Sequence, residues 1–349
     1  MIFEKKIKGK DRTLCEPQTE LKILQKRILS RILCHIQFPH YLHGGVKAAD
    51  PRDFLSNAAA HSKAEAVIAL DIRSFFPSVQ ESLVQKSLMH LCRFPMSVAS
   101  MLSKLVTLND QLPQGSPTSS AISNIVMFEK EYKLASTLEA QGFVYTRLID
   151  DITISSTKLI SPTRVTKIIN QVSKMVTSYG FQLHPDKTSV KSRSNPKELI
   201  LVTGLWLNRG APKILREKRS SISKEVIELY KRALAEGRYS QNYHEDYNSI
   251  SGKVALLCRL NHSRAERLRK LLTDVVPLHD DRTVAKISLV VDRFCRKRVD
   301  TDGLGYIKKF YRIQSQIGIV KRTHPAVAKK LQGQINKVRP TQTLKGIYA

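Results

Sequence analysis

The sequence predicts an α+β protein in which a small sheet with its helices precedes a helical region. Short apolar or alternating runs, typical of strands, occur between residues 66 and 208, with amphipathic helical patterns among them. From about residue 215 the strand patterns thin out and helical patterns dominate. A chain of 349 residues with 42% hydrophobic residues is expected to form two or three packed subdomains.

The first part of the chain predicts three helices and one buried strand. Apolar residues fall on one stripe over 18–37, which predicts an amphipathic helix, and a short apolar run at 66–72 suits a buried strand. Helical spacing returns at 80–91. A longer helical pattern at 117–140 ends near Gly142, which suits the residue after a helix C-cap.

The next part predicts two strand pairs separated by a helix. The segment 143–155 reads as two short strands, and the clearest helical pattern, 161–179, stops at Gly180. A second strand pair is expected at 198–208. In the helical region, Ser263 and Glu266 match a capping box, which predicts a helix start.

The charge points to a polyanionic partner. The chain carries 58 Lys and Arg against 30 Asp and Glu, a net charge of +28. Nucleic acid is the first candidate and an anionic membrane the second. Against the membrane, no apolar run approaches the roughly 18 residues of a spanning helix, and no basic amphipathic helix stands out. The last 47 residues, from Gly303, hold ten Lys or Arg and no acidic residue. A solvated face is the alternative, but a face of one sign repels itself, so a nucleic-acid contact is favoured.

The N-terminus and the cysteines favour a cytoplasmic protein. The opening MIFEKKIKGKDR lacks the apolar core of a signal peptide. The five cysteines are scattered, with no C-x-x-C pair, so we expect reduced thiols and neither disulfides nor zinc ligands. They are Cys15, Cys34, Cys92, Cys258 and Cys295.

Three carboxylates are expected at strand ends. Asp71 ends the run at 66–72, and Asp150 and Asp151 lie between the two strands of YTRLIDDITIS. Converging carboxylates repel one another unless a cation neutralises them, and Mg²⁺ is a hard ion that prefers oxygen ligands. Two such ions about 4 Å apart activate a hydroxyl and stabilise a leaving oxygen in phosphoryl transfer. An ordinary turn is the alternative reading of the aspartate pair.

Five motifs in order carry a resemblance to a known family. ALDIRSFFPSV, LPQGSPTSS, RLIDDITIS, GFQLHPDKT and VTGLWL resemble the palm motifs of reverse transcriptases. NAAAH at 57–61 and VTG at 202–204 resemble the paired signatures of bacterial retron reverse transcriptases. The resemblance covers roughly residues 40 to 275; each motif alone is weak, and together they are specific.

The resemblance implies roles at the carboxylate site. Asp71, Asp150 and Asp151 resemble the catalytic triad that binds two Mg²⁺ ions, with Asp151 the less direct ligand. The carbonyl of Ile72 would be a further metal ligand. Lys187 resembles the lysine that protonates the departing pyrophosphate, with an ordinary surface lysine as the alternative.

Phe76 resembles a steric gate. Its ring would occupy the space of a ribose 2′-hydroxyl, so that dNTPs are preferred to rNTPs; the alternative is a core role, which must hold for Phe75 or Phe76. One departure from the family concerns Leu148 and Ile149, which stand where a Tyr and a small residue usually precede the aspartates. The missing Tyr hydroxyl normally helps to hold the primer end, so slower or more selective synthesis is expected.

The resemblance also assigns residues to the nucleotide. Gln114, Gly115 and Ser116 match the loop that lines the nucleotide pocket, where a glycine lets the backbone approach the base pair. Lys47 and Arg52 lie in the finger segment, where a cation usually meets the triphosphate.

A further set is assigned to retron-specific RNA recognition or to the packing that supports it. His61 is not expected to be catalytic. The set comprises Asn57, His61, Thr203 and Gly204, with Arg264 and Arg267 of the helical region as RNA contacts.

The implied architecture is a right-hand polymerase. We expect fingers at 1–62 and 79–117, a palm with a small antiparallel sheet at 63–78 and 118–222, and a helical, basic thumb at 223–349 that binds RNA or hybrid.

The implied function is RNA-directed DNA synthesis from dNTPs on a cognate structured non-coding RNA. Priming from an RNA 2′-hydroxyl would leave the DNA branched, as msDNA, and a separate effector protein would complete an antiphage defence system. Another bacterial defence polymerase or a group II intron-like enzyme is the second reading. A catalytically weak RNA-binding scaffold that holds an effector is the third.

Overall fold

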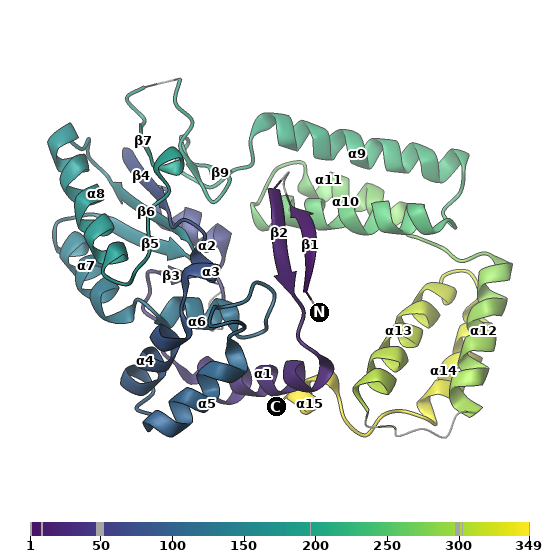
Figure 1. Ribbon diagram of the computed structural model, residues 1–349. Helices are drawn as coiled ribbons and strands as arrows, with labels where there is room; N and C mark the ends of the chain where they lie inside the picture. The colour runs from purple at the N-terminus through teal and green to yellow at the C-terminus, as the bar shows by residue number, and fades with distance from the viewer. Residues whose placement is uncertain are drawn as a thin grey trace. The chain divides into compact units, whose positions relative to one another are not determined.

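The computed structural model describes residues 2–7, 10–46, 52–195, 197–296, 301 and 303–348. The chain divides into two compact units, Met1–Lys213 with Tyr348–Ala349, and Ile214–Ile347 (Figure 1). The predicted thumb start at residue 223 falls inside helix α9 (Arg216–Ala235), so the helical unit begins earlier than expected.

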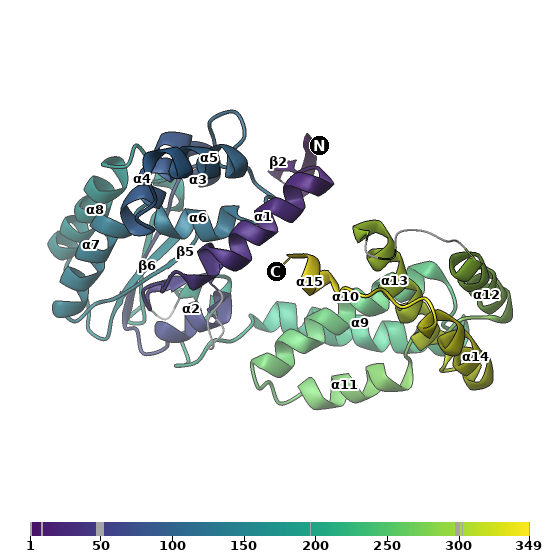
Figure 2. The ribbon, with the colours of Figure 1, turned by 90° about the horizontal axis from the view of Figure 1, so that it is seen from below.

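The first unit opens with a hairpin and a helix. Strands β1 (Ile2–Ile7) and β2 (Lys10–Cys15) pair antiparallel, and α1 (Thr19–Arg31) follows. The helix predicted over 18–37 is therefore too long, because a 3₁₀ turn at Leu33–His35 replaces its end. Helices α4 (Glu81–Leu91) and α5 (Met96–Val106) pack on each other, and α5 contacts α1 (Figure 2).

The central sheet has five strands in the order β3-β5-β6-β4-β7. The neighbours β5–β6, β6–β4 and β4–β7 are antiparallel, as predicted, and the two-residue strand β3 runs parallel to β5. Residues 44 to 143 separate these two strands, and no hairpin dictates their direction. The strands are β3 (Leu42–His43), β4 (Ala66–Asp71), β5 (Val144–Leu148), β6 (Asp151–Ser156) and β7 (Ser189–Ser192).

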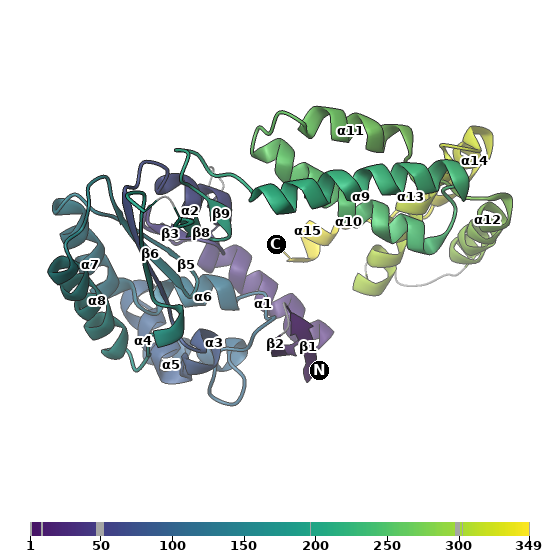
Figure 3. The ribbon, with the colours of Figure 1, turned by 90° about the horizontal axis from the view of Figure 1, so that it is seen from above.

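Helices cover both faces of this sheet. Helices α7 (Phe128–Ala140) and α8 (Pro162–Thr177) lie together on one side, and α2 (Phe54–Ala60) lies on the other (Figure 3). Side chains of a strand alternate between faces, so β5 and β6 each contribute to both layers. The strands predicted at 66–72 and 143–155 and the helix predicted at 161–179 are confirmed.

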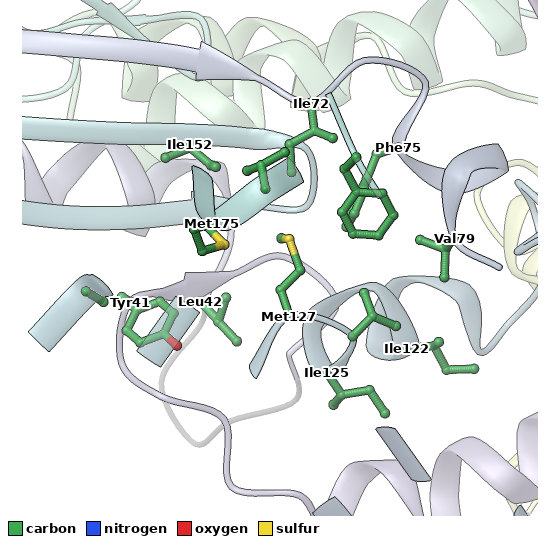
Figure 4. Close-up of a cluster of buried hydrophobic side chains, with 14 of the residues drawn as sticks. Tyr41, Leu42, Ile72, Phe75, Val79, Ile122, Ile125, Met127, Ile152 and Met175 are labelled. Atoms are coloured by element: carbon green, nitrogen blue, oxygen red, sulfur yellow. The ribbon is translucent and has the colours of Figure 1, made fainter. Parts of the chain in front are cut away.

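The core lies under the end of the sheet where the aspartates are found. Figure 4 shows Ile152 of the sheet and Ile72, directly after β4, beside Phe75 and Met127, all at most 2% exposed. Burying each such side chain contributes about 2 kcal/mol, so this end of the sheet is firmly fixed.

The helix predicted over 117–140 is two helices, α6 (Ser119–Ile125) and α7. The chain bends at Val126 and Met127, both at most 1% exposed. Their burial outweighs the continuous helical pattern, because packing overrides propensity. Gly142 has φ +81° just after the C-cap of α7, as expected of a C′ glycine.

Short elements complete the first unit. A helical turn, α3 (Phe75–Ser78), follows β4, and a 3₁₀ turn spans Pro185–Lys187 before β7. The predicted strand pair at 198–208 is confirmed as β8 (Leu201–Val202) and β9 (Leu205–Trp206).

The second unit is helical throughout the residues described, as predicted. Two groups of three helices pack among themselves, and the second group surrounds buried residues such as Val291 and Phe310 (Figure 1). The predicted capping box is wrong, because α11 starts at Ala265 with Arg264 as an N-cap that makes no side-chain cap. The groups are α9, α10 (Gln241–Arg259) and α11 (Ala265–Asp274), then α12 (Asp281–Arg296), α13 (Leu304–Val320) and α14 (Pro325–Asn336), before the final α15 (Leu344–Tyr348).

Two further expectations concern membranes and cysteines. Within the described part of the chain, no helix combines the length and the apolarity needed to cross a bilayer. All five cysteines are free thiols, as predicted.

Candidate active site

The fold brings the three predicted carboxylates to one end of the sheet. Asp71 is the last residue of β4 and pairs in register with Asp151, the first residue of β6. Asp150 lies in the turn between β5 and β6, and its carbonyl accepts a hydrogen bond from the Ile72 N–H at 3.0 Å. Residues distant in sequence are therefore held side by side by backbone pairing.

The turn that carries the aspartates is strained. Ile149 has φ +60°, in the left-handed region, which a β-branched residue rarely adopts. A Cβ added to Gly44 would lie 2.9 Å from Leu148 Cδ1 and 3.4 Å from Ile149 Cγ1. The two residues that depart from the family pattern thus pack tightly against a glycine, and the left-handed backbone costs about 1–3 kcal/mol.

The site concentrates negative charge. Asp71 is 7% exposed, and burial together with the carboxylates of Asp150 and Asp71 raises the pKa of Asp151 to about 6. The positive charge of Lys187 opposes this rise in the pKa of Asp151. Its ammonium donates to both carboxylate oxygens of Asp71, at 2.5 and 2.6 Å. Lys187 therefore lies at the carboxylates, where its predicted role requires it.

The donor set fits a hard divalent cation. Asp71 and Asp151 present oxygen ligands, and a cation would relieve the repulsion that raises the pKa of Asp151. Over the described residues, no group of three or more His, Cys, Asp or Glu side chains is arranged to hold a metal ion as it stands. Asp150, in the turn next to Asp151, is the predicted third carboxylate.

The predicted nucleotide loop is held by the N-terminal segment. Gly115 has φ +109°, and a Cβ there would lie 2.8 Å from the carbonyl oxygen of Cys15. The Cys15 N–H donates to the Gln114 carbonyl at 2.7 Å, and the Ser116 hydroxyl donates to Gln25 Oε1 at 2.9 Å. The close backbone approach at Gly115 is thus made by Cys15, where the sequence argument placed a base pair.

The remaining nucleotide residues have distinct environments. Phe75 is 2% exposed and belongs to the core, whereas Phe76 is only partly buried, so the core role falls to Phe75. Arg52 Nη1 donates to the carbonyls of Phe38 and Pro39, at 3.0 and 2.7 Å, and so braces the chain before β3. Lys47 lies outside the described residues.

Comparison with known proteins identifies the family. Residues 3–216 match the family described as "Reverse transcriptase (RNA-dependent DNA polymerase)". The Retron Se72 reverse transcriptase of Salmonella heidelberg is 37% identical over 331 residues, which cover 95% of this chain and 86% of that protein. The chain belongs to the retron reverse transcriptases.

A second relative and one solved structure are also similar to this retron reverse transcriptase. The Retron Ec48 reverse transcriptase of Escherichia coli is 28% identical, over 82% of this chain and 71% of that protein. Apo telomerase from Candida tropicalis superposes with a TM-score of 0.48 at 9% identity, over 99% of this chain and 63% of that chain. The activity of the family is RNA-directed DNA synthesis.

One retron signature is a buried hydrogen-bond network. Asn57 and His61, on and just after α2, are at most 1% exposed. His61 Nδ1 bonds Ser155 Oγ at 2.7 Å and Nε2 bonds Thr146 Oγ1 at 2.8 Å, and Thr146 in turn donates to Asn57 Oδ1 at 2.5 Å. The signature joins α2 to β5 and β6, so of its two predicted roles the structure favours packing over direct RNA contact.

The second signature meets the first at α2. Thr203 and Gly204 form the β8–β9 turn with φ +49° and +80°. The Thr203 hydroxyl donates to the carbonyl of Phe54, the first residue of α2, at 2.7 Å. Both signatures of the retron reverse transcriptase thus fix one helix against the sheet that bears the aspartates.

The predicted RNA contacts of the helical unit are accessible. Arg264 and Arg267 lie at the start of α11 and are exposed. Their position is compatible with binding of a polyanion, which exposed arginines contact through phosphate.

Sequence reasoning missed a buried ion pair between Arg147 and Glu131. Both side chains are 0% exposed, and Arg147 Nε lies 2.5 Å from Glu131 Oε1. A signal was present: strand alternation places Arg147 on the same face as Tyr145, toward the core, where a lone charge demands a partner.

Proposed function

We propose that this reverse transcriptase copies part of a cognate structured RNA into DNA at the carboxylate site. The observation that carries the proposal is the pairing of Asp71 with Asp151 beside the turn that holds Asp150. Two Mg²⁺ ions, held by these aspartates and the Ile72 carbonyl, would supply activation of the attacking hydroxyl and stabilisation of the leaving oxygen.

The chain's own groups have separate tasks in this proposal. Lys187 Nζ, already at the carboxylates, would give its proton to the departing pyrophosphate. Gln114 and Gly115 would bound the nucleotide pocket, with the Cys15 backbone fixing their position. Lys47 and Arg52 would contact the triphosphate; Arg52 keeps further N–H donors beyond the Nη1 bonds to the chain.

Phe76 is proposed to select dNTPs over rNTPs. A Phe76→Val variant is expected to use rNTPs about 100-fold better relative to dNTPs, because it opens space for a 2′-hydroxyl, and pocket shape discriminates on this scale. Phe76→Tyr, which keeps the bulk of the ring, is the matched control. The ratio of kcat/KM for dGTP and GTP measures the effect, and an unchanged ratio in Phe76→Val would remove Phe76 from this role.

The helical unit is proposed to hold RNA or RNA–DNA hybrid by its phosphates. Its C-terminal helices expose basic side chains and no acidic ones, since the sequence has none from Gly303 onward. Binding through phosphates would weaken steeply with salt. The exposed basic residues of α13, α14 and their flanks are Lys308, Lys309, Arg312, Lys321, Arg322, Lys329, Lys330, Lys337 and Arg339.

We further propose that synthesis is primed from an RNA 2′-hydroxyl and leaves branched msDNA, and that a separate effector protein completes a defence system. The support is membership of the retron reverse transcriptases, whose two signatures this chain carries.

The test is production of branched DNA in cells. The protein is expressed with the non-coding DNA that adjoins its gene, and total nucleic acid is treated with RNase and a debranching enzyme before electrophoresis. A DNA band that shifts on debranching, present with the wild type and absent with Asp150→Asn, is the expected result. Absence of the band from wild-type cells, with phage protection retained by Asp150→Asn, would favour an RNA-binding scaffold.

A further inference from the structure

The buried guanidinium of Arg147 forms hydrogen bonds to α6, to α7 and to the β5–β6 turn that carries Asp150. Arg147, on β5, is 0% exposed. Its Nε and Nη2 donate to the two carboxylate oxygens of Glu131 on α7, at 2.5 and 2.8 Å. Its Nη1 donates to the carbonyl of Ile149 at 2.9 Å, inside the turn that carries Asp150.

The remaining donors of Arg147 reach the end of α6. Nη1 also donates to the Ser123 carbonyl at 3.2 Å, and Nη2 to the Asn124 carbonyl at 3.3 Å. These carbonyls lie in the last turn of a helix, where they lack helical partners. A guanidinium has five N–H donors, so every donor of Arg147 is matched to an acceptor.

Stability alone does not account for this arrangement. Taking two charges out of water is costly, and a buried ion pair can often be replaced by apolar side chains without loss of stability. What apolar side chains cannot supply is a donor to the Ile149 carbonyl. That residue is strained at φ +60°, and a strained turn persists only where its surroundings fix it.

The same residue connects the two halves of the site. Helix α6 starts at Ser119, directly after the loop that contains Gln114 and Gly115. Arg147 bonds the far end of that helix and the aspartate turn at once. Arg147 thereby links the helix that follows the nucleotide loop to the turn that carries Asp150.

We propose that Arg147 is a positioning residue that holds the β5–β6 turn in the geometry needed to bind metal, with Glu131 as its anchor. The inference rests on the proposed metal-binding role of Asp150 and Asp151. It concerns alignment of the turn, and neither Arg147 nor Glu131 touches substrate.

The test separates alignment from stability with a charge-free double variant. Arg147→Met with Glu131→Leu removes both buried charges and keeps apolar bulk. Affinity for Mn²⁺ is measured by electron paramagnetic resonance on the full chain bound to an RNA–DNA hybrid whose primer ends in a dideoxynucleotide. The Tm of each variant is measured as well. The values of kcat and KM for dNTP are measured with an extendable primer. We expect a Tm a few degrees below wild type, because the Tyr145 hydroxyl and the carbonyls of Ser123, Asn124 and Ile149 lose their partners. Mn²⁺ affinity and kcat should each fall about 10- to 100-fold, the range typical of groups that orient metal ligands.

Two controls keep the outcome interpretable. Arg147→Lys keeps the charge but has three donors, so we expect the same direction of change with about 10-fold weaker Mn²⁺ binding even if the double variant fails to fold. Asp150→Asn must abolish synthesis; if it does not, the proposed metal site itself fails, whatever Arg147 does. Wild-type Mn²⁺ affinity and kcat in a folded double variant, or in Arg147→Lys, would overturn the positioning role.

Discussion

Replacing Asp150 with Asn is expected to slow DNA synthesis about 10³-fold or more without unfolding the protein. A metal ion that stabilises charge in the transition state contributes several kcal/mol, and about 4 kcal/mol corresponds to 10³-fold in rate. The Asp150 carbonyl accepts a hydrogen bond from the Ile72 N–H, which fixes the turn. The negative charge of Asp150 contributes to the raised pKa of Asp151. Removing that charge relieves repulsion, so the metal-free protein should be at least as stable as wild type.

Single-turnover extension of a DNA primer on an RNA template measures this effect, with urea unfolding of the same preparations as the test of fold. Glu129→Gln is the matched control, since it also removes one carboxylate but from a side chain 60% exposed on α7. An Asp150→Asn enzyme within about 10-fold of wild type, against the 10³-fold expected of a metal ligand, would exclude Asp150 from the metal site.

The sheet and its aspartates could be predicted from sequence because their signals are local. The apolar run before Asp71 and the alternation on both sides of Asp150 each specify a strand within a few residues. The register that places Asp71 opposite Asp151 follows once those strands pair antiparallel with their apolar faces inward.

The contacts that frame the site could not be predicted in this way, because they join distant segments. Cys15 approaches Gly115, and Gln25 of α1 accepts from Ser116, across about a hundred residues of chain. Nothing near Gly115 in sequence shows whether its open face receives a ligand or another backbone. The family resemblance identified the loop at Gln114 and Gly115, but only the structure shows that Cys15 lies against it.

The retron signatures illustrate the same limit. A motif marks residues but does not show whether they face solvent. Asn57 lies on α2 and His61 directly after it, and both polar side chains are buried. In sequence, such polar residues resemble a binding surface. In the structure their partners are Thr146 and Ser155, which point out of the sheet toward α2.

Acid is expected to weaken the protein through His61, by about 2 kcal/mol between pH 6.5 and pH 5. Burial, and to a lesser extent the charge of His43, lowers the pKa of His61 to about 3. The unfolded chain binds this proton near pH 6.5 and the folded chain does not, so stability falls by about 1.4 kcal/mol per pH unit in this window. The contribution is fully present above pH 6.5 and is lost as pH falls toward 3.

Two other groups contribute to the change of stability with pH. Burial, with the charge of Arg52, lowers the pKa of His43 to about 4, which adds to the loss in acid. Asp151 works in the opposite direction: its pKa is raised to about 6, so the folded state takes up this proton first and gains stability as pH falls through 6. The pH dependence of wild-type stability is therefore the sum of the contributions of His61, His43 and Asp151. Only a variant that removes His61 alone isolates its contribution.

His61→Gln supplies that comparison, because the amide retains one hydrogen bond but cannot titrate. Urea unfolding from about pH 5 to about pH 7 should show a lower stability at neutral pH and a slope shallower by about one proton. His40→Gln, at a side chain 76% exposed, is the control for replacing a histidine. If His61→Gln loses stability in acid as steeply as wild type, the His61 ring takes up its proton in the folded protein as readily as in the unfolded chain. The pKa of His61 is then not lowered, and solvent reaches the contact between α2 and the sheet.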